Sequence, residues 1–164
     1  MVRLKQRYIL FEILYPPSDA EKLSYSSSPR DVLLSLHKSS PSSINQKTLT
    51  KWIRKVIQDH YGDVGGGTAG MLLQVKYFSN KTSTGIIRCG RLSSNLVVGS
   101  LALIDHLAGE DVIVRVTHVS GTIKKCEQYS IQSSRKLMAW MNRGTESIDN
   151  LISGFSTISD DEQD

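Results

Sequence analysis

The stretch from residue 75 to residue 89, VKYFSNKTSTGIIRC, carries cationic and hydroxyl side chains but no carboxylate. Its β-branched and aromatic ends predict two strands, and its polar middle predicts the turn of a hairpin. The cations on or beside this hairpin are Lys76, Lys81, Arg88 and Arg91. Lysine and arginine bind phosphate oxygens, so the hairpin is a candidate contact for an anion. A solvated hairpin tip is the alternative, because surface charge often serves only solubility.

Hydroxyl and amide groups extend this candidate site. Asn80, Thr82 and Ser83 in the turn can donate hydrogen bonds to phosphates or ribose hydroxyls, or can simply form an ordinary turn. Two further cationic clusters occur: Arg3, Lys5 and Arg7 in the first strand's entry segment, and Thr122, Lys124 and Lys125 after a glycine. That glycine permits close backbone approach, and a helix predicted to begin near Glu127 would add its positive end. The N-terminal cluster can also be a flexible charged terminus.

Motifs for protein-based catalysis are missing from this sequence. Gly65-Gly66-Gly67 is not followed by the lysine and hydroxyl residue of a phosphate-binding loop, and no nucleophile elbow occurs. The histidines lack metal-ligand spacing, so we expect no metal site, no cofactor bound by the protein and no protein active site. Cys89 and Cys126 form no CxxC pair and are expected to be buried, inert thiols in a reduced, intracellular protein without a signal or a transmembrane segment.

Charge is unevenly distributed along the 164 residues. The net charge is +4, but Asp160, Asp161, Glu162 and Asp164 form an acidic tail, so residues 1–159 hold 20 basic and 12 acidic side chains, a net charge of +8. A chain of this length suits one domain. A basic body with an acidic tail favours a nucleic acid or an acidic protein as the partner.

The hydrophobic pattern predicts the elements that position these residues. Residues 7–14 alternate as a strand with Ile9, Phe11 and Ile13 on one face. A Ser/Pro-rich excursion at 16–43 follows, with a short helical turn at 31–37. The remaining predicted elements are a helix at 44–61 with a capping box that begins at Ser43 and an end at Gly62, strands at 71–78 and 84–89, a helix at 94–108 ending at Gly109, a strand at 112–119 and a helix at 127–142.

This order predicts an α+β fold, a ferredoxin-like and RRM-like βαββαβ sandwich with an antiparallel sheet, an appended C-terminal helix and the acidic tail. We expect one domain at 1–143 and a variable segment at 144–164. Two helices would cover one sheet face. The other face, with Leu10 and Leu14 from the first strand, would be left for the last helix, through Leu137, Met138 and Met141, for a partner or for RNA.

Two functional classes share this order of elements. RNA-recognition motifs stack bases on strand aromatics, for which Tyr8, Tyr77 and Phe78 are candidates, but the third strand here reads TGIIRC and lacks the diagnostic pattern. A free-standing binder of single-stranded RNA is therefore an alternative reading. Small acyl phosphatases hold phosphate on a loop after the first strand, where Pro16 and Pro17 supply no backbone N–H.

Three stretches in register resemble the Pop-five family: MVRLKQRYILFEI at 1–13, KYFSNKTSTGIIRC at 76–89 and VSGTIKKCEQ at 119–128. Members of this family are the small protein subunit shared by ribonuclease P and ribonuclease MRP, and the yeast forms look most similar. The resemblance runs to about residue 130. It departs at 16–43 and after about 140, so no functional residue is transferred there.

The resemblance implies a non-catalytic subunit that helps an RNA enzyme remove the 5′ leader of precursor tRNA and process precursor ribosomal RNA. It implies ribonuclease P RNA and ribonuclease MRP RNA as partners, with a TIM-barrel protein subunit, other particle proteins and nearby precursor tRNA, in the nucleus and nucleolus. Mg²⁺ is expected at the catalytic RNA. The matched basic positions, which become the expected RNA contacts, are Arg3, Lys5, Arg7, Lys76, Lys81, Arg88, Lys124 and Lys125.

Overall fold

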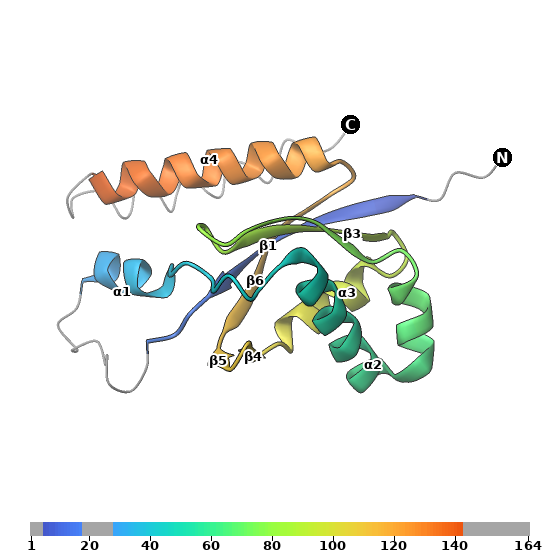
Figure 1. Cartoon of the computed structure of the whole chain (residues 1–164). Helices are drawn as coiled ribbons and strands as arrows, with labels where there is room; N and C mark the ends of the chain where they lie inside the picture. Colours follow the sequence, from blue (N-terminus) through green and yellow to red (C-terminus); the bar gives the residue numbers. More distant parts are fainter. Residues whose placement is uncertain (1–4, 18–27, 143–164) are drawn as a thin grey trace. The chain divides into compact units, whose positions relative to one another are not determined.

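The computed structural model of this chain describes residues 5–17 and 28–142 (Figure 1). Arg3, the variable segment at 144–164 and the acidic tail lie outside the described residues. The elements are β1 (Gln6–Leu14), α1 (Pro29–Leu36), α2 (Gln46–Gly70), β2 (Gln74–Ser79), β3 (Thr84–Gly90), α3 (Ser94–Ala102), β4 (His106–Leu107), β5 (Glu110–Asp111), β6 (Ile113–Ser120) and α4 (Ile123–Asn142). Contacts between residues divide the chain into two compact units, Met1–Glu127 and Gln128–Asp164.

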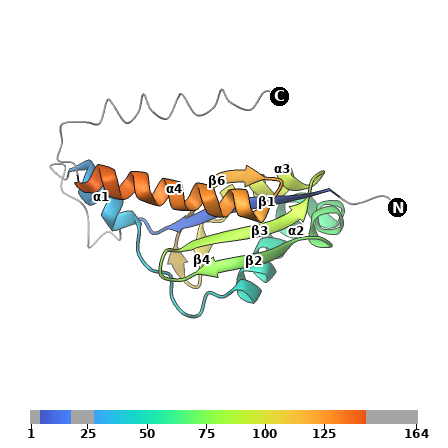
Figure 2. The ribbon, with the colours of Figure 1, turned by 90° about the horizontal axis from the view of Figure 1, so that it is seen from above.

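The first unit contains a four-stranded sheet in the order β2-β3-β1-β6, with every neighbouring pair antiparallel (Figure 2). The two central strands are therefore the first and third of the split βαβ arrangement, and α2 and α3 cover one face (Figure 1). This confirms the predicted α+β, ferredoxin-like fold. The small β4–β5 hairpin stands outside the sheet.

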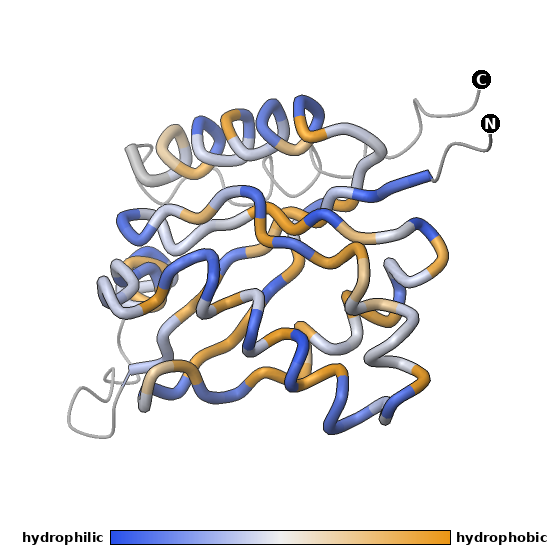
Figure 3. Tube along the Cα trace, turned by 45° about the vertical axis from the view of Figure 1, so that its right-hand side comes forward, coloured by the Kyte–Doolittle hydropathy of each residue, from blue (hydrophilic) through white to orange (hydrophobic). Residues whose placement is uncertain are grey.

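Alternation along β1 determines which residues form the core. Ile9, Phe11 and Ile13 point toward the helices, where they join Ile53 of α2 and Leu101 of α3, all at most 1% exposed. The apolar positions, orange in Figure 3, run along the strands and the two helices. The predicted face of β1 is confirmed.

The outer face of β1 is also covered in part. Leu10 packs with Ile86 of β3 and Cys126, which lies in the first turns of α4, and Tyr8 borders this second cluster. Leu10 is 5% exposed and Leu14 is 7% exposed. Of the alternatives predicted for this face, burial within the chain is the one found for these two leucines.

Helix α2 differs from its predicted form at both ends. Its N-cap is Asn45, whose side chain accepts a hydrogen bond from the Thr48 backbone N–H at 2.9 Å, so the capping box predicted from Ser43 is wrong. Gly62 has a non-helical backbone conformation (φ 63°, ψ −164°), which glycine adopts readily, and it kinks α2. The first helical segment therefore stops near the predicted position, but a second segment follows it. This second segment runs through the three consecutive glycines to Gly70. The sequence had predicted a connecting loop for these glycines.

The predicted bounds of two other helices differ from the structure at one end. Helix α3 ends at Ala102 and not at Gly109, since Ala108 (φ 54°) and Gly109 (φ 85°) form the two-residue turn between β4 and β5. Helix α4 begins at Ile123, four residues before the predicted start near Glu127. None of the helices in the described ranges combines the length and hydropathy that a bilayer crossing needs.

Both cysteines are free and have no exposed surface. Burial raises the pKa of the Cys89 thiol to about 11, against a smaller opposing effect of Arg7, and burial also raises the pKa of Cys126. Because a thiol with a raised pKa holds its proton more tightly in the folded state, Cys89 contributes stability below its ordinary pKa of 9.0, and that stability is lost as the pH rises from there to about 11.

We expect both thiols to be protected from a soluble disulfide reagent such as dithiodipyridine. In the native protein at pH 8 they should react at least about a hundredfold more slowly than in denaturant, because reaction requires exposure and a thiolate. The absorbance of the released thiopyridone gives both rates. One thiol that reacts at the same rate in both conditions contradicts its burial.

Candidate nucleic-acid interface

The β2–β3 turn uses much of its hydrogen-bonding capacity inside the chain. The side-chain amide of Asn80 donates to the carbonyls of Pro41 and Ile44 at 2.7 and 2.8 Å. The Asn80 carbonyl accepts from the backbone N–H of Ser40 at 2.8 Å. The turn is therefore joined to the segment that leads into α2, and Asn80 has no amide hydrogen left for RNA. The predicted role of Asn80 as a hydrogen-bond donor to RNA is therefore not available in this structure.

Ser83 is 1% exposed and has a positive φ of 52°. Its hydroxyl donates to the Lys38 carbonyl at 2.7 Å and accepts from Ser40 Oγ at 2.9 Å, while Ser40 Oγ accepts from Tyr15 Oη at 2.8 Å. The Tyr15 hydroxyl is buried, and this burial raises its pKa although the bond to Ser40 opposes the rise. A side chain enclosed in this way cannot reach a phosphate, so Ser83 is removed from the candidate contacts.

Lys76, Lys81 and Thr82 are the candidates on this hairpin that stay exposed. Thr82 Oγ1 shares a 2.7 Å hydrogen bond with Thr84 Oγ1. Lys81 lies at the tip, whereas Lys76 lies on edge strand β2 at a register shift between Val75 and Tyr77. The hairpin therefore presents two lysine charges and one threonine hydroxyl to an anionic partner.

The other candidates meet at the opposite end of the sheet. Strand β1 begins there, Arg7 lies opposite Cys89 of β3, and Tyr8 lies opposite Ser120 of β6. A Cβ atom built on Gly121 would be 3.5 Å from Arg7 Nη1, so the guanidinium borders the loop that precedes α4. Six residues of strand separate Arg7 from Ile13, which contacts the hairpin turn, and this corresponds to about 20 Å. The sequence-predicted contacts thus form two groups at two ends of the sheet.

Thr122, Lys124 and Lys125 stand at the start of α4. Thr122 Oγ1 accepts from the Lys125 backbone N–H at 3.4 Å, and the Thr122 N–H donates to Ser120 Oγ at 3.4 Å. Both lysines occupy the first turn, where carboxylates are usually preferred because the helix N-terminus carries a partial positive charge. Exposed cations at this position add to the helix field and favour an anionic contact.

Arg88 belongs to this end but lies on the other side of β3 from Cys89, opposite Tyr8 and Gln74. Its Nη2 donates to Gln74 Oε1 at 3.3 Å, and its buried Nε has no hydrogen-bond partner within the described ranges. Buried donors without an acceptor are uncommon in native proteins.

The aromatic candidates for base stacking are not equivalent. Phe78 packs against the main core and stacks on Phe11, with ring centroids 6.4 Å apart and an interplanar angle of 10°. It is therefore unavailable for a base, which corrects that expectation. Tyr8 is half-buried beside the Leu10 cluster, and Tyr77 is 49% exposed.

Arg91 lies beside the hairpin in the sequence and is not among the RNA contacts that the resemblance implies. Its backbone N–H donates to the Lys5 carbonyl at 3.0 Å, which places both cations at the β1-start end of the sheet. The signal that groups them is the pairing of β1 with β3, because Gln6 lies opposite Gly90. Sequence separation conceals this proximity.

This chain is similar in sequence to proteins of known name. A chain of the solved structure of yeast ribonuclease MRP aligns with a TM-score of 0.44 and 15% identity, over 82% of this chain and 98% of that chain. The ribonuclease P/MRP protein subunit POP5 of Saccharomyces cerevisiae is 47% identical over 139 residues, covering 84% of this chain and 80% of the relative. The same subunit of Schizosaccharomyces pombe is 44% identical over 135 residues, covering 82% and 89%. The sequence profile of the Rpp14/Pop5 family matches residues 7–131, and the chain belongs to this family.

Proposed function

We propose that this chain is a non-catalytic protein subunit of the ribonuclease P and ribonuclease MRP ribonucleoproteins. The observation that carries the proposal is its 47% identity, over 84% of its length, to a protein named as a subunit of those particles. In this role the protein binds and stabilises the catalytic domain of the RNA. The particles then remove the 5′ leader from precursor tRNA and process precursor ribosomal RNA.

In the proposed particle, the RNA and the protein supply different chemical groups. The RNA supplies the reaction centre with its Mg²⁺ ions, and the protein supplies cations, hydrogen-bond donors and a rigid sheet. Phosphate contacts of this kind determine position on an RNA more than sequence preference. The particle works in the nucleus and nucleolus, with a TIM-barrel subunit and other particle proteins bound and precursor tRNA nearby.

The β1-start end of the sheet is the better supported of the two RNA-facing ends. It combines Arg7 beside Gly121 with Arg88 and with the first turn of α4. The hairpin tip has lost two of its predicted donors to internal hydrogen bonds. We therefore assign the main RNA contact to the β1-start end and a smaller contact to Lys81.

Affinity purification of the tagged full-length chain from cells, with sequencing of bound RNA at moderate salt, tests the proposed function. Recovery of ribonuclease P RNA and ribonuclease MRP RNA, together with a TIM-barrel protein, is the expected result. Recovery of scattered messenger RNAs would instead support a free-standing RNA binder. A purification without RNA would contradict both readings.

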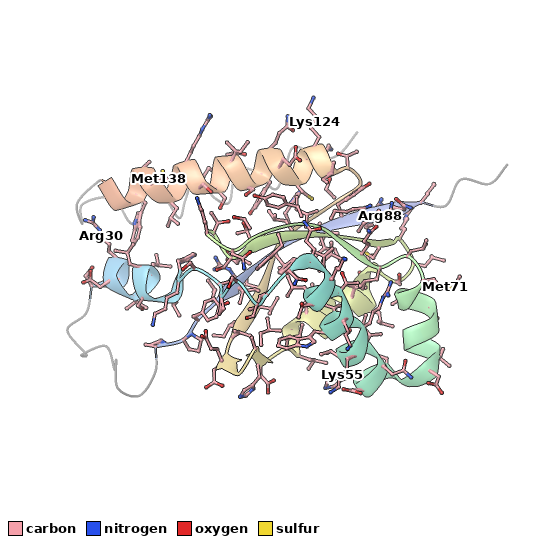
Figure 4. The ribbon with its side chains drawn as sticks, viewed as in Figure 1. Arg30, Lys55, Met71, Arg88, Lys124 and Met138 are labelled. Carbon is pink, nitrogen blue, oxygen red and sulfur yellow. The ribbon has the colours of Figure 1, made fainter. Side chains whose placement is uncertain are left out.

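Reversing the charge of Lys124 should weaken assembly with the RNA. Lys124→Glu removes a cation from the first turn of α4 and is expected to lower RNA retention several-fold, with a salt dependence reduced by about one unit of slope. Lys55→Glu on α2 is the matched control, because it makes the same charge change at an exposed site on the helix-covered side of the sheet (Figure 4). RNA retention is measured over a series of salt concentrations. Equal retention of the two variants would contradict the assignment of this end.

A further inference from the structure

Three large apolar side chains in the described part of the chain are almost fully in solvent. Val64 is 82% exposed, Met71 is 87% exposed and Leu92 is 98% exposed. Single exposed apolar residues are ordinary on protein surfaces, but a group of them marks an interaction site. Val64 and Met71 lie at the end of α2 and outside both basic groups described above, whereas Leu92 follows Arg91 at the β1-start end.

These three residues lie on two neighbouring segments. A Cβ atom built on Gly65 would be 3.7 Å from Leu96 Cδ1, and one built on Gly90 would be 3.5 Å from Leu72 Cδ1. The end of α2, from Val64 to Met71, therefore runs beside the connection from β3 to α3, which carries Leu92. Met71 lies at the end of this unit away from the hairpin tip (Figure 4). We call Val64, Met71 and Leu92 the apolar patch.

Gly67 makes a gap within this patch. It lies between Val64 and Met71 on the exposed face of the helix, at a spacing of three and four residues, and the two side chains are about 10 Å apart along the axis. A Cβ atom on Gly67 would meet nothing within 4 Å. Glycine costs a helix about 1 kcal/mol relative to alanine, and no contact among the described residues requires it here.

Neighbouring glycines differ in this respect, which makes Gly67 informative. A Cβ atom on Gly65 would collide with the Tyr61 side chain, and one on Gly66 would collide with Gln58. Packing against Tyr61 explains Gly65, whereas the exposed Gln58 side chain could move away from a side chain at position 66. The bare backbone at Gly67 leaves space for a side chain that comes from another molecule.

The border of the patch is cationic on the Leu92 side. Arg91 precedes Leu92, and its backbone N–H binds the Lys5 carbonyl at 3.0 Å. Among the described residues neither side chain has a carboxylate within ion-pair distance. On the Val64 side, Asp63 already accepts a hydrogen bond from Gln58. A hydrogen bond from a neutral amide leaves the Asp63 charge in place, so the positive charge belongs to the Leu92 side of the patch.

We propose that the apolar patch, with Gly67, Lys5 and Arg91, is a docking surface for a partner protein whose binding segment presents an apolar side chain flanked by carboxylates. The apolar side chain fits over Gly67 between Val64 and Met71, and the carboxylates pair with the two cations. Methionine and arginine are enriched at protein interfaces, and this surface contains Met71 and Arg91. The inference stands on exposure and charge, and does not depend on the RNA partners proposed above.

Photo-crosslinking in the full-length chain tests this surface. We would place p-benzoylphenylalanine at Leu92 in cells, and at the half-exposed Leu34 of α1 as the matched control. The expected result is one dominant protein crosslink from Leu92, absent from Leu34, mapped by mass spectrometry to a peptide with apolar and acidic residues. A dominant crosslink to RNA, to residues 143–164 of the same chain or to a second copy of the chain would overturn the proposal, as would equal yields at the two positions.

Variants then test the two parts of the surface separately. Gly67→Arg fills the gap and should reduce the Leu92 crosslink about tenfold without loss of thermal stability, since a Cβ atom at this exposed position has no described neighbour within 4 Å. Arg91→Glu should reduce it through charge repulsion. Gly67→Ala is the control for helix stability and should keep most of the crosslink. A full crosslink in both Gly67→Arg and Arg91→Glu would contradict the proposed partner chemistry.

Discussion

Replacement of Gly85 by alanine is expected to lower the free energy of unfolding by about 2 to 3 kcal/mol. A Cβ atom at this position would lie 2.6 and 2.7 Å from two ring atoms of Phe11 and 3.0 Å from the Tyr77 carbonyl oxygen. Phe11 is opposite Gly85 in the sheet, is 1% exposed and stacks on Phe78, so its ring cannot move without disturbing the core. A close-packed interior makes such overpacking costly.

Chemical denaturation of the purified chain measures this effect, with Gly67→Ala as the matched control. Gly67 is an exposed helical glycine with open space around it, so the same substitution there should raise stability by about 0.5 to 1 kcal/mol. Phe11→Leu combined with Gly85→Ala should recover part of the loss, because the smaller side chain makes room. Unchanged stability of Gly85→Ala would show that the ring of Phe11 does not lie against this glycine.

Replacement of Asn80 by alanine is expected to cost about 2 kcal/mol of stability, because it removes the amide donors that satisfy the Pro41 and Ile44 carbonyls. The loss should also make the segment around Ser40 more sensitive to proteolysis, since Asn80 joins that segment to the sheet. Unfolding curves and limited proteolysis with mass spectrometry measure the two consequences.

Thr82→Ala is the matched control for Asn80, since Thr82 is exposed in the same turn and bonds only to Thr84 among the described residues. It should change stability by less than about 0.5 kcal/mol. The pair also separates structure from RNA contact. An Asn80→Ala variant that keeps its stability and loses RNA binding would contradict the internal role and restore the interpretation drawn from the sequence.

The candidate site was predicted in part. Arg7, Lys81 and Lys124 stay predicted RNA contacts, and the sequence suggests them because clustered cations and a glycine are visible along the chain. Their grouping was not predictable, since Arg7 and Gly121 meet only through pairing of β1 with β6. The patch around Gly67 was also missed, because the three glycines read as a loop while tertiary packing holds them in α2.

By itself the sequence determined the order of the elements and the two faces of β1. Both follow from local periodicity: side chains alternate along a strand, and apolar residues recur along a helix with its own period. The tertiary structure alone decided the accessibility of the candidate contacts. Ser83 has the same polar turn chemistry as Thr82, but the segment at 38–40 covers Ser83 and leaves Thr82 exposed. Burial depends on contacts between residues far apart in the chain, and local composition does not contain that information.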